Sequence, residues 1–154
     1  MKNFRIGALL LTLVAVFTVV SPFVFDWNAT HIYNPRWTPH AKFHNAQTML
    51  LAVFLGFSTL YFTWRTARAT AERRLQLKAA ILFALAYWVT QILGVTFPGT
   101  ALLDPEFVAS NPTVQSFTIP IQPIVDVVIF VLLGIAYYLE NRRINEQNSA
   151  TENL

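Results

Sequence analysis

Hydrophobic residues dominate four separate stretches that together make up more than half of the 154-residue chain: residues 6–25, 46–64, 79–97 and 119–139. Each stretch is close to the roughly 20 residues that a helix needs to cross about 30 Å of hydrocarbon. Inside a bilayer the backbone has to satisfy its own hydrogen bonds, which helices do and four strands, too few to close a barrel, do not. The pattern therefore predicts an all-α fold, a four-helix transmembrane bundle.

The residues beside these stretches indicate where the helices begin and end. Thr38 followed by Pro39 is typical of an N-cap and a first helical position, so the second helix is expected to begin there. The segment Phe97-Pro98-Gly99-Thr100 is a strong stop signal for the third helix. Pro120 and Pro123 predict a broken or kinked start of the fourth helix.

These signals predict helices at about 6–25, 39–64, 79–97 and 119–139. Residues 1–143 are expected to form one transmembrane domain, and the polar residues 144–154 a disordered cytoplasmic tail. Lys2 and Arg5 precede the first stretch as they do in a signal peptide. That stretch is long for a signal peptide, however, and no Ala-x-Ala site follows it, so we expect an uncleaved helix.

The positive charges are distributed unevenly between the two sides of the predicted bundle. Only Arg36 and Lys42 lie in the first and third loops. The other nine of the 11 cationic residues lie at the N-terminus, in the middle loop or after the fourth stretch: Lys2, Arg5, Arg65, Arg68, Arg73, Arg74, Lys78, Arg142 and Arg143. This bias predicts a multi-pass membrane protein with both termini cytoplasmic. Anionic lipid headgroups, and not nucleic acid, are the expected neighbours of the basic loop.

Several classes of chemistry are excluded by what the sequence lacks. It contains no cysteine, which excludes disulfides, thiolate catalysis and cysteine-based metal sites. It also contains no glycine-rich nucleotide-binding loop, no GxSxG motif and no chain of charged residues along a pore. Soluble nucleotide chemistry and channel conduction are therefore poorly supported.

The remaining polar residues gather at one end of the predicted bundle. The predicted topology places six ionisable side chains on the non-cytoplasmic face: Asp26, His31, His40, His44, Asp104 and Glu106. Asp126 lies seven residues into the fourth stretch, roughly 10 Å deep at about 1.5 Å per residue, and Gln91 lies at a similar depth. This convergence predicts a functional site at that face.

Asp126, His40 and His44 are the candidate catalytic residues. An acidic side chain within a membrane helix is costly and usually faces the bundle interior or a wet cavity, where it serves as a general acid, a general base or a proton-binding group. The structural alternative is a hydrogen bond between helices. His40 and His44 are four residues apart on a predicted helix, so they share a face and are suited to orient a substrate or transfer a proton.

The same histidine pair has the spacing of divalent-metal ligands, although the Glu of an HExxH motif is absent. We predict no metal and no cofactor. If a metal is present, its ligands are expected to be His40 and His44 with Asp126, Asp104 or Glu106.

Five further residues are candidates for substrate binding: His31, Asn34, Arg36, Gln47 and Gln91. For His31, Asn34 and Arg36 the alternative is loop architecture, with Asn34 bonded to the backbone and Arg36 stacked on an aromatic ring. Tyr87 and Trp88 lie in the middle of the third stretch, where core packing is expected and a flat apolar ligand is the alternative.

Two signatures in the chain resemble those of a family of small, uncharacterised four-helix integral membrane proteins. The first runs from His31 to His44, with the pattern His-aliphatic-aromatic-Asn-Pro-x-Trp-x-Pro-His-Ala-basic-Phe-His, and the second comprises residues 97–100 and 104–107. The resemblance covers nearly the whole chain except the tail and implies fungal and bacterial members, some of them labelled acetyltransferase, a label for which no acyl-CoA motif is visible. The architecture resembles the DoxX-like group more loosely.

Three functions from different classes fit these observations. The first is a membrane enzyme that performs acid–base chemistry, such as isomerisation or cyclisation, on a lipophilic small molecule. The second is a non-catalytic membrane subunit whose first and third loops dock a membrane partner or another copy of the chain. The third is metal or proton binding in transport.

Overall fold

The computed structural model describes residues 5–67, 69–102 and 121–152. These residues contain four helices and no strand: α1 (Ile6–Phe25), α2 (Pro39–Trp64), α3 (Thr70–Gly94) and α6 (Ile121–Glu152). The all-α prediction is thereby confirmed. Each helix is long and apolar enough to cross a membrane, which is consistent with a multi-pass membrane protein.

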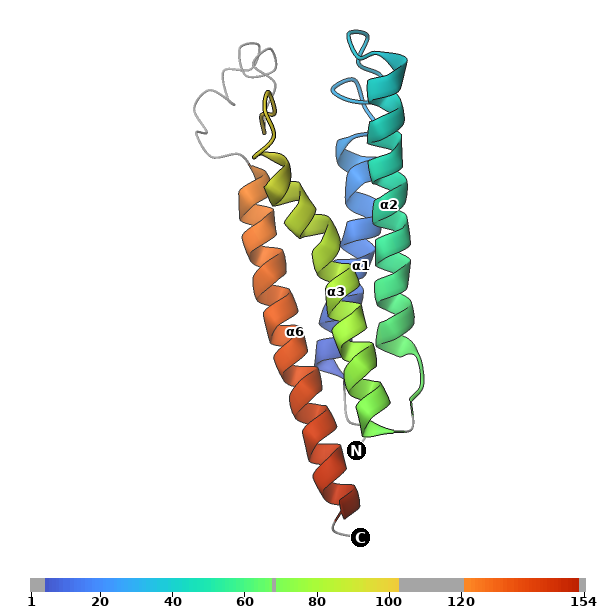
Figure 1. The fold of residues 1–154 in the computed structure, drawn as a ribbon, viewed down its shortest axis with the longest axis vertical. Coiled ribbons are helices and arrows are strands. Elements are labelled where there is room, and N and C mark those ends of the chain that lie inside the picture. The colour runs from blue at the N-terminus through green and yellow to red at the C-terminus, as the bar shows by residue number, and fades with distance from the viewer. Residues whose placement is uncertain (1–4, 68, 103–120, 153–154) are drawn as a thin grey trace.

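The helices form an elongated bundle in which successive helices run in opposite directions (Figure 1). Both α1 and α3 pack against α2 and α6, and they also touch each other across the bundle. The start of α1 and the end of α6 lie together at one end, which we call the terminal end. The loop between α1 and α2, residues 26–38, lies at the opposite end, which we call the loop end.

The ends of α1 and α2 agree with the prediction, and those of α3 do not. The Thr38 hydroxyl accepts a hydrogen bond from Ala41 N at 3.2 Å, which confirms the predicted N-cap. Helix α3 begins at Thr70, nine residues before the apolar stretch, because residues 70–78 are mostly good helix formers. It ends at Gly94, three residues before the predicted stop, and tight turns follow.

Helix α6 continues through the residues that the sequence analysis expected to be disordered. It reaches Glu152, and Pro123 lies in its first turn, where a missing N–H is tolerated. The end of α6 is held by side chains from the first turns of α3: Thr70 donates to Asn148, Arg73 to Gln147 and Arg74 to Asn145. Hydropathy alone does not report such contacts between distant polar residues.

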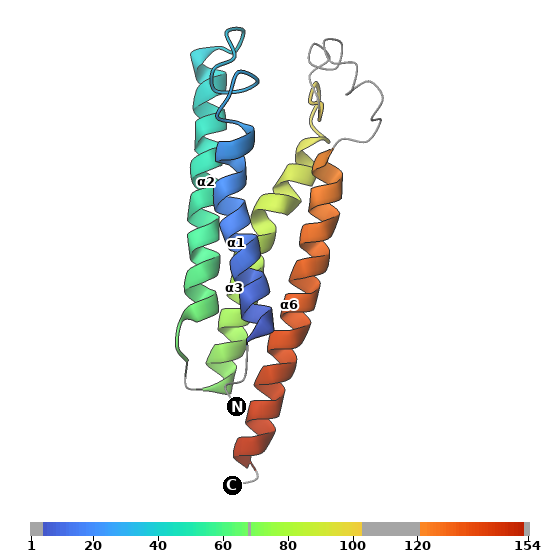
Figure 2. The same cartoon turned by 180° about the vertical axis from the view of Figure 1, so that it is seen from behind.

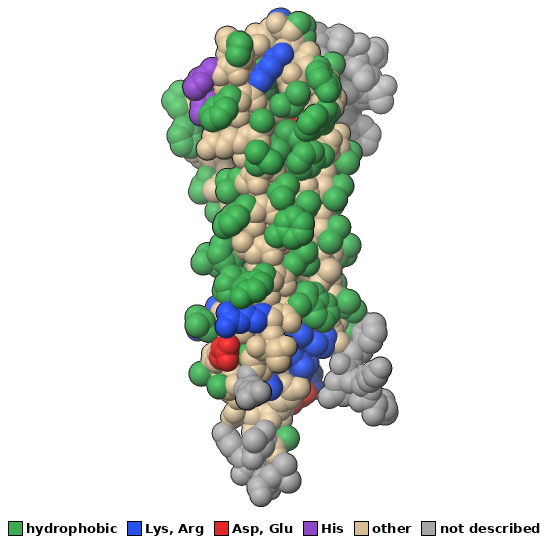
Figure 3. Space-filling model, turned by 90° about the vertical axis from the view of Figure 1, so that its right-hand side faces the viewer, with side chains coloured by type: hydrophobic (Ala, Val, Ile, Leu, Met, Phe, Trp, Pro, Cys, Tyr) green, Lys and Arg blue, Asp and Glu red, His purple; other side chains and the backbone are tan. Residues whose placement is uncertain are grey.

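The bundle interior combines alanines with larger buried side chains such as Leu11, Met49 and Trp88, and large apolar side chains also cover its outside. Ala8, Ala52, Ala80 and Ala136 are completely buried. Large hydrophobic residues such as Leu50, at 65% exposure, face outward. In Figure 3 hydrophobic side chains cover the middle of the bundle, while Lys and Arg gather at the terminal end and histidine at the loop end. So broad an exposed apolar surface is unfavourable in water and is typical of a surface that contacts lipid.

Two glycines allow α1 to approach its neighbours closely. A Cβ added at Gly7 would lie 2.7 Å from Ala136 O and 2.7 Å from Glu140 Cγ, both on α6. A Cβ added at Gly56 would overlap a methyl group of Val19 and lie 2.8 Å from Ala15 O, both on α1. The bundle therefore has tight crossings without a GxxxG motif.

Replacing either glycine by alanine should destabilise the bundle. We expect Gly7→Ala and Gly56→Ala to cost about 1–3 kcal/mol, because the new methyl group overpacks each crossing. Gly134→Ala is the matched control, since nothing lies within 4 Å of a Cβ there. It should be neutral or stabilising by up to about 1 kcal/mol. Thermal unfolding in detergent measures all three, and equal stability of the three variants would contradict these crossings.

Candidate functional site

A pocket of about 560 Å³ lies at the loop end of the bundle. Helices α1 and α6 are close at the terminal end and diverge toward the loop end (Figures 1 and 2). Five aromatic side chains line the pocket: Phe17, Phe25, Trp37, Tyr87 and Trp88. Its polar lining comprises Ser21, Asp26, Thr30, His31, Gln91 and Gln122. An apolar cavity with a few polar groups has the composition of a small-molecule site.

The aromatic wall is held rigidly by contacts between α1 and α3. The Phe17 and Trp88 rings stack with centroids 5.6 Å apart, and Tyr87 packs edge-on against Trp88 at 5.2 Å. Trp88 is only 2% exposed, and its Nε1 donates a hydrogen bond to Thr18 Oγ1 at 3.0 Å. Tyr87 and Trp88 thus serve both in core packing and in the wall of a cavity.

His31 and Asp26 face each other at this pocket. Asp26 follows the last residue of α1, and the turn after it returns the chain so that Ile32 N donates to Asp26 O at 3.2 Å. His31 Nε2 lies 3.9 Å from Asp26 Oδ1, and the His31 ring packs edge-on against Trp37 at 5.1 Å. Asn45 of α2 donates to Asp26 Oδ2 at 3.3 Å. The carboxylate is therefore oriented from two sides.

The hydrogen bonds around Asn28 and Thr30 fix the tautomer of His31. Asn28 Nδ2 donates to Phe25 O at 2.6 Å, so Asn28 Oδ1 is the acceptor for the Thr30 hydroxyl at 2.6 Å. The Thr30 oxygen, 2.7 Å from His31 Nδ1, can then only accept. His31 therefore carries a proton on Nδ1, and Nε2, which faces Asp26 Oδ1, is the ring nitrogen that can take up or release a second proton.

His40 and His44 lie outside the loop-end pocket. Both are exposed on α2, and neither lines the pocket. Their Nε2 atoms are 3.1 Å apart, and His44 Nδ1 lies 3.2 Å from Oε1 of Gln47, which is also exposed. The predicted shared face is thus present, but the structure does not join it to Asp126.

The histidine pair offers two metal ligands. Two neutral Nε2 atoms this close require a proton or a metal cation between them. Because Gln47 Oε1 can only accept a hydrogen bond, it favours the His44 tautomer that has its proton on Nδ1 and an unprotonated Nε2. Among residues 5–67, 69–102 and 121–152 no group of three or more His, Asp or Glu side chains is positioned to hold a metal. Asp104 and Glu106, predicted as further ligands, lie outside the described residues.

Asn34 and Arg36 build the loop. Asn34 is 2% exposed, and its Nδ2 donates to Thr30 O at 3.2 Å while its Oδ1 accepts from Arg36 N at 3.0 Å. Asn34 thus supports the turn that carries Thr30 and His31. Arg36 is exposed and does not line the pocket.

Gln91 and Asp126 lie deeper in the bundle. Gln91 lines the pocket from α3. Asp126 is 2% exposed, and its Oδ1 has no hydrogen-bond partner among the described residues. Val125 and Gln122, on the adjacent turn of α6, line the pocket, so Asp126 lies next to it without being part of its wall.

Sequence reasoning missed four polar residues of this site: Ser21, Asn28, Thr30 and Gln122. The spacing of Asp26, Asn28, Thr30 and His31 within six residues is a signal that could have identified the cluster. Gln122 lies four residues before Asp126, on the same face of α6.

A comparison with protein families matches residues 10–151 to a family of unknown function, DUF6640. The chain belongs to the DUF6640 family. The DUF6640 match includes every residue that lines the pocket at the loop end. Neither a curated protein nor a solved structure shows significant similarity to the chain. The predicted membership of an uncharacterised family is confirmed by the DUF6640 match. The similarity of that family to the DoxX-like group and its occurrence in fungi and bacteria stay predictions.

The tautomer of His31 can be tested by ¹⁵N NMR of histidine-labelled protein, with the signal assigned by its loss in His31→Ala. We expect protonated Nδ1 in the wild type. Thr30→Val should remove this preference and cost about 1 kcal/mol of stability, because it deletes the acceptor of the Nδ1 proton. Thr90→Val is the control, because the Thr90 hydroxyl bonds only to carbonyls of its own helix. A wild-type His31 protonated on Nε2 alone would refute the network.

Proposed function

We propose that this chain is a multi-pass membrane enzyme that binds a lipophilic small molecule in the loop-end pocket and transfers protons with His31 and Asp26. The observation that carries the proposal is the position of the Asp26–His31 pair at an aromatic-lined pocket of about 560 Å³. The three candidate catalytic residues of the sequence analysis do not meet in the structure, so the proposal rests on a different histidine.

The proposed orientation places both termini in the cytoplasm and the pocket at the non-cytoplasmic end. It is supported by the arginines at the terminal end, among them Arg5, Arg65, Arg73 and Arg143. Cytoplasmic loops of membrane proteins carry such an excess of cations. A substrate dissolved in the bilayer would then reach the pocket from the lipid or from the non-cytoplasmic surface.

The chemistry follows from the fixed tautomer of His31. Nε2 accepts a proton, and Asp26 Oδ1 at 3.9 Å stabilises the imidazolium that forms. An imidazole removes a carbon-bound proton only where a neighbouring carbonyl acidifies it. A double-bond isomerisation therefore fits: Nε2 takes the proton from one carbon and returns it to another, with no net change in atoms or electrons. The amides of Gln91 and Gln122 line the same pocket and are suited to bind the carbonyl oxygen.

A non-catalytic role in docking a membrane partner is the second candidate. Trp27, Tyr33 and Phe43 are 52%, 59% and 59% exposed at the loop end, and Trp27 Nε1 donates to the Tyr33 hydroxyl at 2.7 Å. Exposed aromatic residues are typical both of interfaces and of the membrane-surface belt. Recovery of one stoichiometric partner, lost on Phe43→Ala, would favour this role over catalysis.

Filling the pocket should exclude its ligand. Ser21 is 7% exposed and lines the pocket, whereas Val20 beside it is 47% exposed on the outer face of α1. We expect wild type and Val20→Phe to retain a co-purified lipophilic compound, and Ser21→Phe to lose it. Mass spectrometry of solvent extracts of the purified proteins measures this. Equal recovery from all three, or none from the wild type, would contradict the binding role.

Replacing His31 should abolish catalysis of the recovered compound. We expect His31→Ala to lower turnover by about 100-fold or more, because a positioned acid–base group contributes that much. The assay is conversion of the compound that was recovered from the wild type, followed by mass spectrometry and NMR. His44→Ala distinguishes the two assignments: the structure predicts full activity, whereas the sequence-based assignment predicts its loss. Unchanged turnover in His31→Ala would refute the proposed role.

A further inference from the structure

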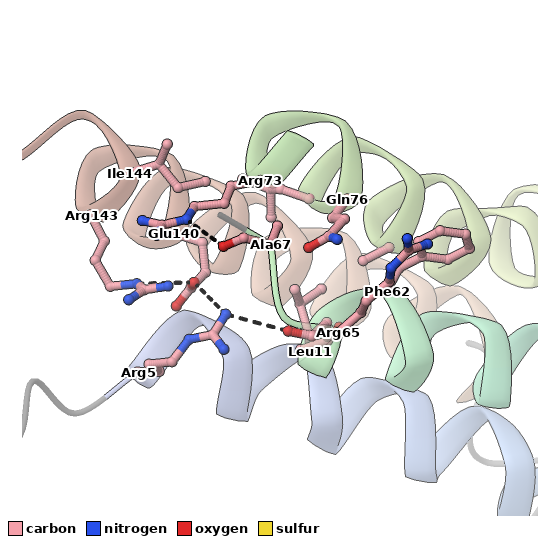
Figure 4. A pocket seen from close by; sticks show the side chains of 13 residues that line it. Arg5, Leu11, Phe62, Arg65, Ala67, Arg73, Gln76, Glu140, Arg143 and Ile144 are labelled. Carbon is pink, nitrogen blue, oxygen red and sulfur yellow. Dashed lines mark hydrogen bonds and ion pairs between the residues drawn. The ribbon is translucent and has the colours of Figure 1, made fainter. Parts of the chain in front are cut away.

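A second cavity, of about 110 Å³, lies at the terminal end of the bundle, far from the pocket described above. Every helix or its flanking residues contributes an arginine to the lining: Arg5 before α1, Arg65 after α2, Arg73 on α3 and Arg143 on α6. In Figure 4 Arg5 and Arg143 point toward Glu140, Arg73 lies beside Ala67, and Arg65 lies farther along the lining beside Phe62. The sequence analysis used the same cations to predict orientation and expected anionic lipid headgroups beside the basic loop, but it predicted no cavity there.

Glu140 is the one acidic side chain in this lining. It is 4% exposed and accepts hydrogen bonds from Arg5 at 3.0 Å, Arg143 at 3.2 Å and the backbone N–H of Ala8 at 3.1 Å. Glu140 supplies one negative charge, and Glu72, 3.7 Å from Arg65, supplies a second, so two carboxylates face four guanidinium groups. The cavity therefore has an excess of positive charge that is only partly balanced from within.

Two of the guanidinium groups, those of Arg5 and Arg73, are held in place by contacts within the protein. Arg73 Nε donates to Ala67 O at 3.1 Å, and its Nη1 donates to Gln147 Oε1 at 2.8 Å. Arg5 Nη2 donates to Thr63 O at 3.3 Å, and its guanidinium lies 5.2 Å from the Trp64 ring. Fixed donors lose little entropy when an anion binds to them.

One buried donor in this cluster has no acceptor. Arg5 Nε is buried and has no hydrogen-bond partner among the described residues. A buried N–H of a charged group that lacks an acceptor is costly. Together with the surplus of positive charge, this donor favours the binding of an anionic acceptor at the cavity.

We infer that this cavity binds a phosphate group. Guanidinium groups match phosphate oxygens in geometry and bind them through paired, charge-assisted hydrogen bonds. The volume is sufficient for several waters or for a small oxyanion. The cavity lies at the end of the apolar spans, level with lipid headgroups on that side of a bilayer. The phosphate can belong to an anionic lipid or to a soluble phosphate compound, and the experiment separates these sources.

The test measures the melting temperature of the purified full chain in a non-ionic detergent. Phosphatidylglycerol, phosphatidylcholine and inorganic phosphate are the three probes. We expect phosphatidylglycerol to raise the Tm by several degrees, and phosphatidylcholine to have a much smaller effect. A similar rise with inorganic phosphate identifies a general phosphate site, and a rise with phosphatidylglycerol alone identifies a lipid headgroup site. No rise with either anionic probe overturns the inference.

Variants distinguish the cavity from diffuse attraction. Arg65→Gln should weaken the effect about tenfold or more in probe concentration. The Arg65 side chain is 48% exposed, lies 3.7 Å from Glu72 and lies over the Tyr61 ring at 5.8 Å; contacts this exposed contribute little stability, so the variant should fold. Arg73→Gln provides a second lining variant. Arg142→Gln is the matched control, because Arg142 lies at the same end, pairs with Glu146 and does not line the cavity. Equal weakening in Arg142→Gln overturns the inference.

Discussion

A polar side chain within an apolar bundle has to find a partner on another helix or lie where the bundle ends. This constraint organises the whole structure. The middle of the bundle contains apolar residues and a few hydroxyl groups that bond to their own helix, as Thr18 and Thr59 do. Apart from the buried Asp126, the charged groups of the described residues are at the two ends. Glycine at positions 7 and 56 then allows the helices to approach closely between them.

The two ends differ in their chemistry. At the loop end the chain turns back just after α1, which brings His31 to Asp26 beside a large, aromatic-lined cavity. At the terminal end arginines surround one buried carboxylate, Glu140, and a much smaller cavity. The first arrangement suits proton transfer on an apolar molecule, and the second suits retention of an anion. Because the bundle separates them, a variant at one end should leave the other intact.

Hydropathy predicted the four spans, and the Thr38-Pro39 cap predicted the start of α2 to the residue, since these features are local in the sequence. The continuation of α6 to Glu152 depends on contacts with α3, more than 70 residues away, which no local pattern encodes. The arrangement of the candidate functional site likewise depends on how distant segments of the chain pack together. The predicted topology placed Asp126, His40 and His44 at the same end of the bundle, but in the structure both histidines are exposed on α2 whereas Asp126 is buried on α6.

The most direct test is whether the loop end and the terminal end lie on opposite sides of a membrane. Single introduced cysteines report this by their accessibility, and the chain has no cysteine of its own that would give a background signal. Ala29→Cys lies in the loop between α1 and α2, and Thr66→Cys lies in the turn between α2 and α3; both positions are exposed. In intact expressing cells, a membrane-impermeant maleimide should label Ala29→Cys, and it should label Thr66→Cys only after the membrane is opened. Labelling of both cysteines from the same side would contradict the arrangement.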